Sequence, residues 1–448
     1  MAVQIQSAIR ERIQDGTLHP GVRLPSSRDL AGDLGVSRSV VVQAYAQLIA
    51  EGCLRATQGS GTTVATHLPR LRRIAPRPDG GPEARYDLRV DAMGSAFFPA
   101  REWLRAYEAV GRSIGGAGPR RHPLGVPRLR EELAVYLGRS RGVLATAAEV
   151  AVTADFDHTV GVLCHVVLGG LGIQHIAVEN PGLPWQVGLA KHAGLRVTGV
   201  PVDQEGIDVE ALARSGARAV LVTPVSQVPT GAVLSPGRRE ALLRWADAAN
   251  GWIIEYDREG HLWFGAGSGP LALQRHRPER VIYTGSTGAL LGPCVRLGWA
   301  VAPAAVTARL GRTQLGAPDP LTQLTFARFL ASGLLDQHVR RIRGVFRTRR
   351  AALADAVEEH LPGARTTGGP SGTHAYVQLP CGVDDVRLAG LARAGSVLVH
   401  PGRQFQLGRR PTAPAIVLGY GAVRSGLLPE ALGVLGTALR RAEGALAV

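Results

Sequence analysis

The chain has 448 residues, 45% of them apolar and 19% charged, which excludes a largely disordered protein. This length predicts two or three domains with a large buried core. The 51 basic residues outnumber the 36 acidic ones and give a net charge of +15, which suits an anionic partner. Only one basic residue, Lys191, is a lysine, so chemistry that needs a lysine amine has a single candidate.

The cysteines and the apolar runs exclude further classes. The 4 cysteines are scattered, without a C-x-x-C pair or clustered histidines, which argues against a disulfide framework and against a metal site. The N-terminal segment MAVQIQSAIRERIQDG lacks the apolar stretch of a signal peptide, and no apolar run approaches the roughly 18 residues of a membrane span. We therefore expect a cytoplasmic protein without a membrane partner.

Residues 1–66 predict three helices followed by a β-hairpin. Isoleucines spaced by four mark the first helix, and Ser26 or Ser27 can cap the second. Ser37 can cap a third helix, which ends before Gly52. The segments CLRAT and TTVAT flank a Gln-Gly-Ser-Gly turn, which is typical of a hairpin. Together these elements indicate a winged helix-turn-helix domain.

The rest of the chain divides into a linker and a larger α/β body. Residues 67–85 are basic, rich in proline and glycine, and without periodicity, as linkers are. In residues 86–448, strand-like segments alternate with helical ones, which predicts a mostly parallel seven-stranded sheet covered by helices. The segments are EVAVTA, HIAVEN, RVTGVPV, AVLVTPV, WIIEYD, RVIYTG and VRLGWAVA. A long helix near 337–359 introduces a small α+β subdomain at about 335–448.

The N-terminal domain resembles the winged-helix domain of GntR-family regulators. The resemblance covers nearly all of residues 1–66 and includes L-P-S-S-R, G-V-S-R, A-Y-x-x-L, E-G and G-S-G-T. It implies double-stranded DNA as a partner, with Arg38 and Ser39 on the first turn of a recognition helix in the major groove. The implied DNA contacts are Arg28, Ser37, Arg38, Ser39, Gln43 and, at the tip of the wing, Gln58 and Gly59.

The charge of this region supports DNA binding. Residues 1–77 contain 10 arginines and 5 acidic residues, a net charge of +5, so we expect salt-dependent binding to phosphates. The alternative is that Arg28 and Arg38 are ordinary solvated charges. Because the whole motif stands in register, we favour DNA binding.

Residues 86–440 resemble the effector domain of MocR-type regulators, which has the fold of type I pyridoxal-phosphate (PLP) aminotransferases. Matching stretches include FFPAREWLRA, VENPGLPWQVGLAKHAGLRV, TPVSQVPTG and YTGSTGALLGPCVRLGW. A GntR domain followed by an aminotransferase-like domain is itself the order that defines this class. The resemblance implies a homodimer, domain-swapped head to tail, in which each winged domain lies on the body of the other chain.

The chain departs from the family at the cofactor lysine. The family pattern is approximately Y-x-G-T-F-S-K-x-L-x-P, and its lysine, which binds PLP covalently, corresponds to Ala289. Lys191 matches an ordinary helical residue of the family. We therefore expect no bound PLP, no catalytic residue and no enzymatic activity.

Three other cofactor-site positions also differ. Tyr256 stands where the family has the aspartate that pairs with the ring nitrogen, although an offset of one residue would place Asp257 there. Leu183 replaces the aromatic residue that covers the ring. Val417 replaces the arginine that holds the substrate carboxylate.

The phosphate-binding positions are partly retained. Ser286 and Arg296 match the family, whereas Asp155-Phe156-Asp157 replaces its G-S-Q motif. Two carboxylates at this place oppose the binding of an anion, although a helix N-terminus would favour it. Arg296 can alternatively be a structural residue that pairs with Asp155 or Asp157.

Three functions remain open. In the first, the protein is a transcription factor whose former cofactor cleft binds another small molecule, polar or zwitterionic. In the second, the body is only a dimerisation scaffold, and in the third and weakest the protein is an active aminotransferase. The first two differ in whether Tyr256 and Arg258 line the cleft or close it. The candidate pocket residues are Asp155, Asp157, His158, Tyr256, Arg258, Ser286 and Arg296.

Overall fold

The computed structural model describes residues 1–57, 61–65, 84–90, 94–115, 122–313, 318–408 and 413–444. The chain forms two compact units, residues 1–81 and 82–448. Of the predicted features, Gln58, Gly59 and most of the 67–85 linker lie outside the described residues.

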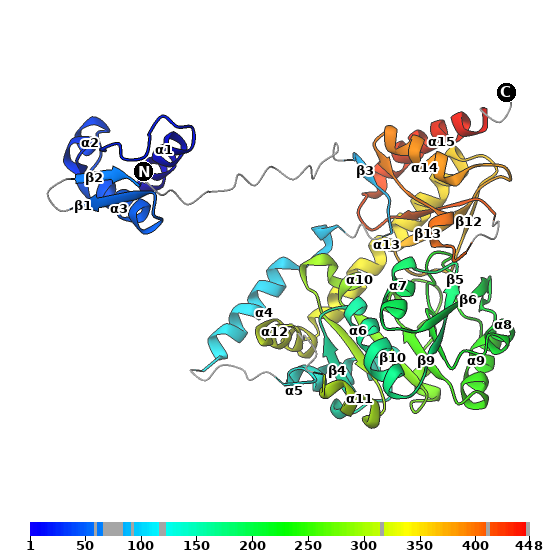
Figure 1. Ribbon diagram of the computed structural model, residues 1–448. Coiled ribbons are helices and arrows are strands. Elements are labelled where there is room, and N and C mark those ends of the chain that lie inside the picture. Colours follow the sequence, from blue (N-terminus) through cyan, green and yellow to red (C-terminus); the bar gives the residue numbers. More distant parts are fainter. Residues whose placement is uncertain are drawn as a thin grey trace. The chain divides into compact units, whose positions relative to one another are not determined.

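The first unit consists of three helices and a two-stranded antiparallel hairpin (Figure 1). The elements are α1 (Ala2–Gln14), α2 (Ser27–Asp33), α3 (Arg38–Ala50), β1 (Leu54–Thr57) and β2 (Gly61–Val64). The isoleucine stripe of α1 packs against Val41 and Leu48 of α3, which are fully buried. At the far end of α3, Arg10 of α1 pairs with Glu51 at 2.9 Å. The predicted winged helix-turn-helix architecture is confirmed.

The capping serines behave differently from one another. Ser26 caps α2, because its hydroxyl accepts a hydrogen bond from the Asp29 amide at 3.2 Å. Ser37 occupies the corresponding position before α3, but its side chain makes no capping hydrogen bond. Its hydroxyl instead lies 2.9 Å from that of Ser39, which competes for it. The prediction of a Ser37 cap is therefore wrong.

The second unit is built on an eight-stranded sheet. Its strands, in spatial order, are β4 (Val150–Thr153), β11 (Gly298–Val301), β10 (Val281–Ser286), β9 (Trp252–Tyr256), β8 (Ala219–Val222), β5 (His175–Asn180), β6 (Arg196–Asp203) and β7 (Gly206–Ile207). Strands β10, β9, β8, β5 and β6 are paired in parallel, whereas β11 is antiparallel to both of its neighbours. All seven predicted strands are present. The eighth strand, β7, was not predicted; it has two residues and pairs antiparallel with the end of β6.

Helices cover both faces of this sheet, so its strands are mostly buried, apart from β6 near one edge (Figure 1). Along β5, Ile176 and Val178 face one side of the sheet and Ala177 faces the other, where they join two different clusters of helical side chains. The helices are α4 (Ala100–Ser113), α5 (Pro127–Arg141), α6 (Phe156–Val162), α7 (Pro184–His192), α8 (Val209–Arg214), α9 (Pro236–Ala248), α10 (Gly288–Leu291), α11 (Ala304–Gly311) and α12 (Pro320–Ala331).

A smaller α+β part completes the unit. Its antiparallel sheet has the order β12 (Arg365–Thr367), β13 (His374–Gln378), β16 (Ala415–Gly419) and β15 (His400–Pro401). The helices are α13 (Leu334–His360), α14 (Asp385–Ala394) and α15 (Leu428–Gly444). A separate pair, β3 (Tyr86–Asp87) with β14 (Val397–Leu398), joins the start of the unit to this part. The predicted α/β body with a small C-terminal α+β part is confirmed.

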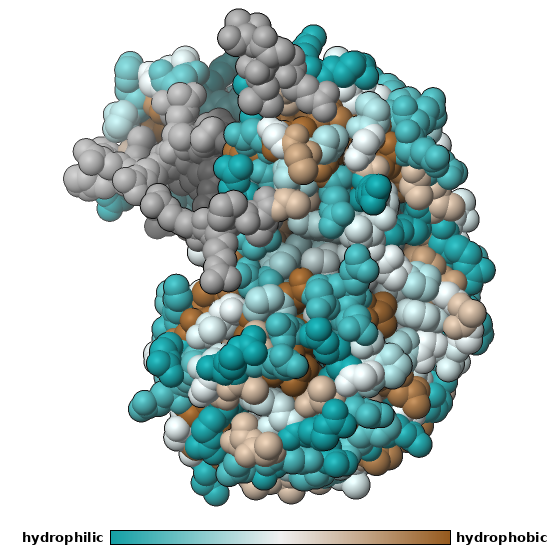
Figure 2. Space-filling view, turned by 90° about the vertical axis from the view of Figure 1, so that its right-hand side faces the viewer, coloured by the Kyte–Doolittle hydropathy of each residue, from teal (hydrophilic) through white to brown (hydrophobic). Residues whose placement is uncertain are grey.

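Hydrophilic side chains cover most of the face drawn in Figure 2, and apolar residues appear there in small separate patches. None of the described helices is long and apolar enough to cross a membrane. Within the described ranges, no three His, Cys, Asp or Glu side chains group so that they could hold a metal ion.

Candidate DNA-binding helix and effector cleft

Every predicted DNA-contact residue in the described part of the first unit is exposed to solvent. These residues are Arg28, Ser37, Arg38, Ser39 and Gln43. Arg38 Nε lies 3.4 Å from Ser27 Oγ, which brings the start of α3 to the start of α2. The opposite face of α3 is anchored, because Val41, Ala44 and Leu48 are fully buried and Tyr45 donates its hydroxyl hydrogen to Pro25 O at 2.9 Å. The helix can therefore present its outer face without losing its core contacts.

In the second unit, a cleft of about 490 Å³ lies where four strands of the large sheet end. Tyr256 ends β9 and Ser286 ends β10, while Asp155 and Leu183 follow β4 and β5. These strands run in the same direction, and the carboxyl ends of such strands are the usual ligand-binding edge of an open α/β sheet. Of the seven predicted pocket residues, six line this cleft: Asp155, Asp157, Tyr256, Arg258, Ser286 and Arg296.

His158 is the exception, since it is not among the residues that line the cleft. Its Nδ1 accepts a hydrogen bond from the Ala154 amide at 3.1 Å, which turns the ring back over the start of α6. The prediction that placed His158 in the pocket is corrected by this local contact. Sequence spacing alone gave no sign of it.

Arg296 forms an ion pair with Asp155, which is one of the two alternatives that the sequence left open. Asp155 also caps α6, accepting a hydrogen bond from the His158 amide at 2.8 Å. Burial opposes ionisation of Asp155, but this hydrogen bond and the Arg296 guanidinium together hold its pKa below the ordinary value. A charged carboxylate thus already occupies the start of the helix, beside the retained arginine.

The rings of Tyr256 and Phe156 stack nearly parallel, with 7° between their planes. Both are buried, with exposed fractions of 6% and 3%. Trp185 approaches Phe156 edge-on, with 5.6 Å between ring centroids. Tyr256 therefore lines the cleft and also fills part of it through this stack. Sequence reasoning gave no role to Phe156 or Trp185, although the D-F-D run was a usable signal for the first.

Arg258 lines the same cleft with 13% of its side chain exposed. Its Nη1 lies 3.7 Å from Oε1 of Glu259, which is completely buried. Burial opposes the charge of Glu259, yet Arg258, His374 and Thr373 together hold its pKa far below the ordinary value. Arg258 therefore has an ionised neighbour behind the cleft wall.

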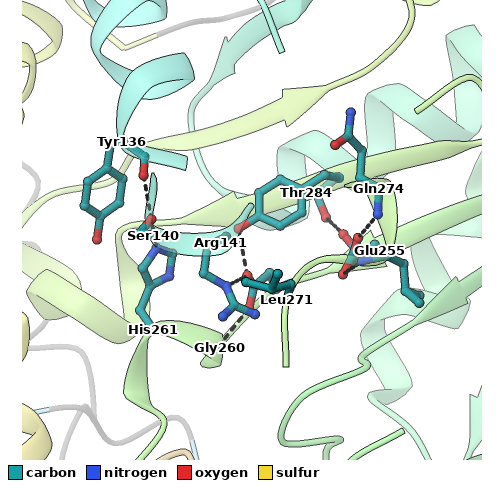
Figure 3. Close-up of polar contacts among 12 residues, drawn as sticks. Tyr136, Ser140, Arg141, Glu255, Gly260, His261, Leu271, Gln274 and Thr284 are labelled. Carbon is teal, nitrogen blue, oxygen red and sulfur yellow. Dashed lines mark hydrogen bonds and ion pairs between the residues drawn. The ribbon is translucent and has the colours of Figure 1, made fainter. Parts of the chain in front are cut away.

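Asp257 does not enter the cleft. Its carboxylate accepts hydrogen bonds from Arg141 Nε at 2.5 Å, Tyr283 Oη at 2.7 Å and the Gly260 amide at 2.9 Å. Figure 3 shows Arg141 beside Gly260 in this buried network, together with Glu255, another acid of the same segment. Because successive residues of a strand face opposite ways, Tyr256 faces the cleft while its neighbour Asp257 is held elsewhere. The one-residue offset is therefore not adopted.

The lysine position of the family holds a methyl group on the cleft wall. Ala289 lies in α10, is 8% exposed and lines the cleft. Lys191 is exposed on α7 and is not among the lining residues. The cleft therefore has no amine of its own.

Comparison with known proteins identifies the two units. Residues 1–64 match the family model "Bacterial regulatory proteins, gntR family", and residues 104–414 match "Aminotransferase class I and II". The chain is 31% identical to the HTH-type transcriptional regulator TauR of Rhodobacter capsulatus, across 98% of this chain and 96% of that protein. The chain belongs to the MocR-type regulators of the GntR family.

Two further relatives of this MocR-type regulator carry functional names. It is 33% identical to the HTH-type pyridoxine biosynthesis transcriptional regulator PdxR of Corynebacterium glutamicum, across 84% of this chain and 82% of that protein. It is 27% identical to the probable rhizopine catabolism regulatory protein MocR of Rhizobium meliloti, across 98% and 94% of the two chains.

Solved structures place the body of the MocR-type regulator in the aminotransferase fold. An archaeal alanine:glyoxylate aminotransferase superposes with a TM-score of 0.73 at 22% identity, covering 80% of this chain and 91% of that one. A multiple substrate aminotransferase from Thermococcus profundus also gives 0.73, at 21% identity and with coverage of 82% and 93%. At this level of identity the likeness concerns the fold alone.

Proposed function

We propose that this MocR-type regulator binds operator DNA through its winged domain and neither binds PLP nor catalyses a reaction. Its cleft then binds a different small molecule, whose occupancy changes DNA binding. The observation that carries this proposal is Ala289, which lines the cleft where the family has its PLP lysine. Covalent attachment of PLP needs an amine within reach, and the cleft lining offers none.

The remaining residues also fit PLP poorly. Phe156 and Tyr256 stack on each other where a cofactor ring would need an aromatic neighbour on one face and a carboxylate at its nitrogen. Arg296 and Ser286 could hold a phosphate, but Arg296 is already paired with Asp155. A phosphate would have to separate that pair and lie beside a carboxylate of the same sign. These features support loss of the cofactor.

The test is a titration of the full-length protein with PLP, followed by visible absorbance and intact mass after borohydride reduction. We expect no saturable covalent adduct in the cleft. Because Lys191 is exposed and can react nonspecifically, the matched control is Lys191→Arg. Lys191→Arg has no lysine left, so a saturable complex of one PLP per chain that persists in this variant, whether or not reduction traps it, would contradict the proposal.

The DNA-binding role includes proposals on particular residues and boundaries. We assign DNA contacts to Arg28, Ser37, Arg38, Ser39 and Gln43, all exposed, together with the wing-tip residues Gln58 and Gly59. We propose that the winged domain spans residues 1–66, the linker residues 67–85 and the body residues 86–448. The functional form is a homodimer, domain-swapped head to tail. Sedimentation measures the dimer, and selection from a random DNA library supplies the operator sequence.

One observation favours the scaffold alternative, in which the cleft has no ligand. The Phe156–Tyr256 stack fills part of the space with the protein's own rings. A cleft of about 490 Å³ nevertheless remains, which is within the size range of small-molecule sites. The scaffold alternative predicts that DNA affinity does not change with any small molecule.

A further inference from the structure

We propose that the cleft binds a planar aromatic molecule that carries no negative charge. This inference depends on the proposed function, in which the cleft is an effector site. It differs from the polar or zwitterionic ligand that the sequence suggested. It follows from three properties of the lining: its apolar wall, the pairing of its arginines, and the half-buried Trp185.

Most of the cleft wall is apolar. The side chains that contribute carbon surface are Phe156, Leu183, Trp185, Tyr256, Ala289, Pro293, Val295 and Leu297. Pockets of this kind gain most of their binding free energy from buried apolar area, and a few polar groups set the orientation. The methyl group of Ala289 adds to this wall where an amine would have been polar.

Arg296 is 74% exposed, but its Nη2 already contacts Asp155, so an incoming anion has to compete with that carboxylate. The Asp155 carboxylate is fixed by the chain and by the His158 amide at 2.8 Å, so it competes at a high effective concentration. Displacing it would leave a carboxylate beside the new anion. This arrangement disfavours a phosphate or carboxylate ligand.

Arg258 is neutralised from behind by Glu259, whose carboxylate lies 3.7 Å from Arg258 Nη1 and has no exposed side-chain surface. The charged side chains of the lining are Asp155, Asp157, Arg258 and Arg296, and their formal charges cancel. The buried Glu259 then makes the surroundings slightly negative. Electrostatic attraction at this cleft therefore favours a neutral or cationic ligand over an anionic one.

Trp185 supplies the aromatic contact. It is half-buried, whereas Phe156 and Tyr256 are almost fully buried against each other. Trp185 meets Phe156 at 76° between ring planes, an edge-on arrangement that leaves the indole as the most accessible aromatic surface in the cleft. Planar rings bind such surfaces by stacking or edge contacts. A planar ligand is thus the shape that this wall accommodates.

The experiment compares two probes that share a ring and differ in charge, indole and indole-3-acetate, by calorimetric titration into the full-length protein. We expect indole to bind at least about tenfold more tightly than indole-3-acetate, and inorganic phosphate not to compete. Trp185→Ala should weaken indole binding by about tenfold, while Lys191→Ala on the same helix should leave it unchanged. Urea denaturation of each variant, which follows the unfolding of the body, verifies that the body is folded.

A second variant tests the charge argument directly. Asp155→Asn keeps a side chain that can cap α6 but removes the charge that neutralises Arg296. We expect this variant to bind indole-3-acetate about tenfold more tightly than the unmodified protein does, so that the preference for indole shrinks. An unchanged preference would contradict the proposed role of Asp155.

The unmodified protein can overturn the inference in two ways. The inference requires indole to bind more tightly than indole-3-acetate, so equal or tighter binding of the acid contradicts it. Absence of saturable binding by either probe, with DNA binding intact, also contradicts it and favours the scaffold alternative. Neither result involves a covalent adduct with PLP, so both leave the proposed loss of the cofactor untouched. A PLP adduct in the cleft would instead contradict the proposed function itself.

Discussion

Thr373 donates its hydroxyl hydrogen to Glu259 Oε1 across 2.5 Å, joining the small α+β part to the loop that follows strand β9 of the large sheet. Glu259 Oε2 accepts from Ser226 Oγ at 2.8 Å and lies 3.4 Å from His374 Nδ1. All four residues are buried. Since Glu259 also neutralises Arg258, one carboxylate connects the cleft wall to the small part of the body.

Replacement of this carboxylate should be strongly destabilising. Glu259→Ala leaves the Ser226 and Thr373 hydroxyls without their acceptor and removes the carboxylate that neutralises Arg258. We expect a loss of about 3–5 kcal/mol in the free energy of unfolding of the body, measured by urea denaturation. The matched control is Glu358→Ala, an exposed acid on α13, which should change stability by less than about 0.5 kcal/mol. A small effect at Glu259 would mean that the connection between the two parts is weak.

Glu179 predicts a dependence of stability on pH. Burial raises its pKa from 4.5 to about 8, although the Thr223 amide donates to it at 3.1 Å. Between these two pH values the folded state keeps a proton that the unfolded state has lost. The contribution of Glu179 is therefore complete below pH 4.5 and is lost as the pH rises toward 8, by about 1.4 kcal/mol per pH unit.

Glu179→Gln removes this titration while keeping an oxygen that can accept from Thr223. We expect the variant to gain stability relative to the unmodified protein as the pH rises from 5 to 8, about 1.4 kcal/mol per unit at most. Urea denaturation at several pH values measures the difference. Parallel pH profiles of the two proteins would show that Glu179 ionises normally.

The sequence predicted the fold well because its signals are local. Each of the seven predicted strands is a short segment rich in apolar residues, and each coincides with an observed strand. The two-residue β7 was missed because so short a segment carries no periodicity. The Ser37 cap failed for a similar reason, since the competing Ser39 hydroxyl becomes apparent only when side-chain geometry is known.

The cleft was only partly predictable, because its decisive contacts join distant residues. Phe156 and Tyr256 are 100 positions apart, and nothing in their sequence neighbourhoods indicates that their rings stack. The ion pair between Asp155 and Arg296 is one of the two alternatives that the sequence leaves open, because both residues belong to the phosphate-binding positions of the family and carry opposite charges. Arg141 and Tyr283 are the buried partners of Asp257. Neither carries a sequence signal that distinguishes it from an ordinary helix or strand residue.

Arg38 should be important for DNA affinity. It is exposed at the start of α3, where a bidentate contact with guanine or a phosphate contact is geometrically accessible. We expect Arg38→Ala to cost about 1–3 kcal/mol of binding free energy for the selected operator, measured by fluorescence anisotropy. Arg12→Ala, which removes an exposed arginine of α1, is the matched control and should have little effect. Equal losses in both variants would indicate a general charge effect rather than a contact of Arg38.

Ala289→Lys tests whether the missing amine is the sole obstacle to PLP binding. We expect this variant alone not to form a stable covalent PLP adduct, because Tyr256 still stacks on Phe156 and Asp155 still pairs with Arg296. Visible absorbance during PLP titration, with intact mass after reduction, measures the adduct, and Lys191→Arg in the same background removes the competing amine. Adding Tyr256→Asp and Asp155→Ser should increase PLP affinity, since these changes clear the ring space and release the arginine for phosphate. A tight adduct in the single variant would mean that the cleft still accommodates the cofactor and that the lost lysine is the only barrier to PLP binding.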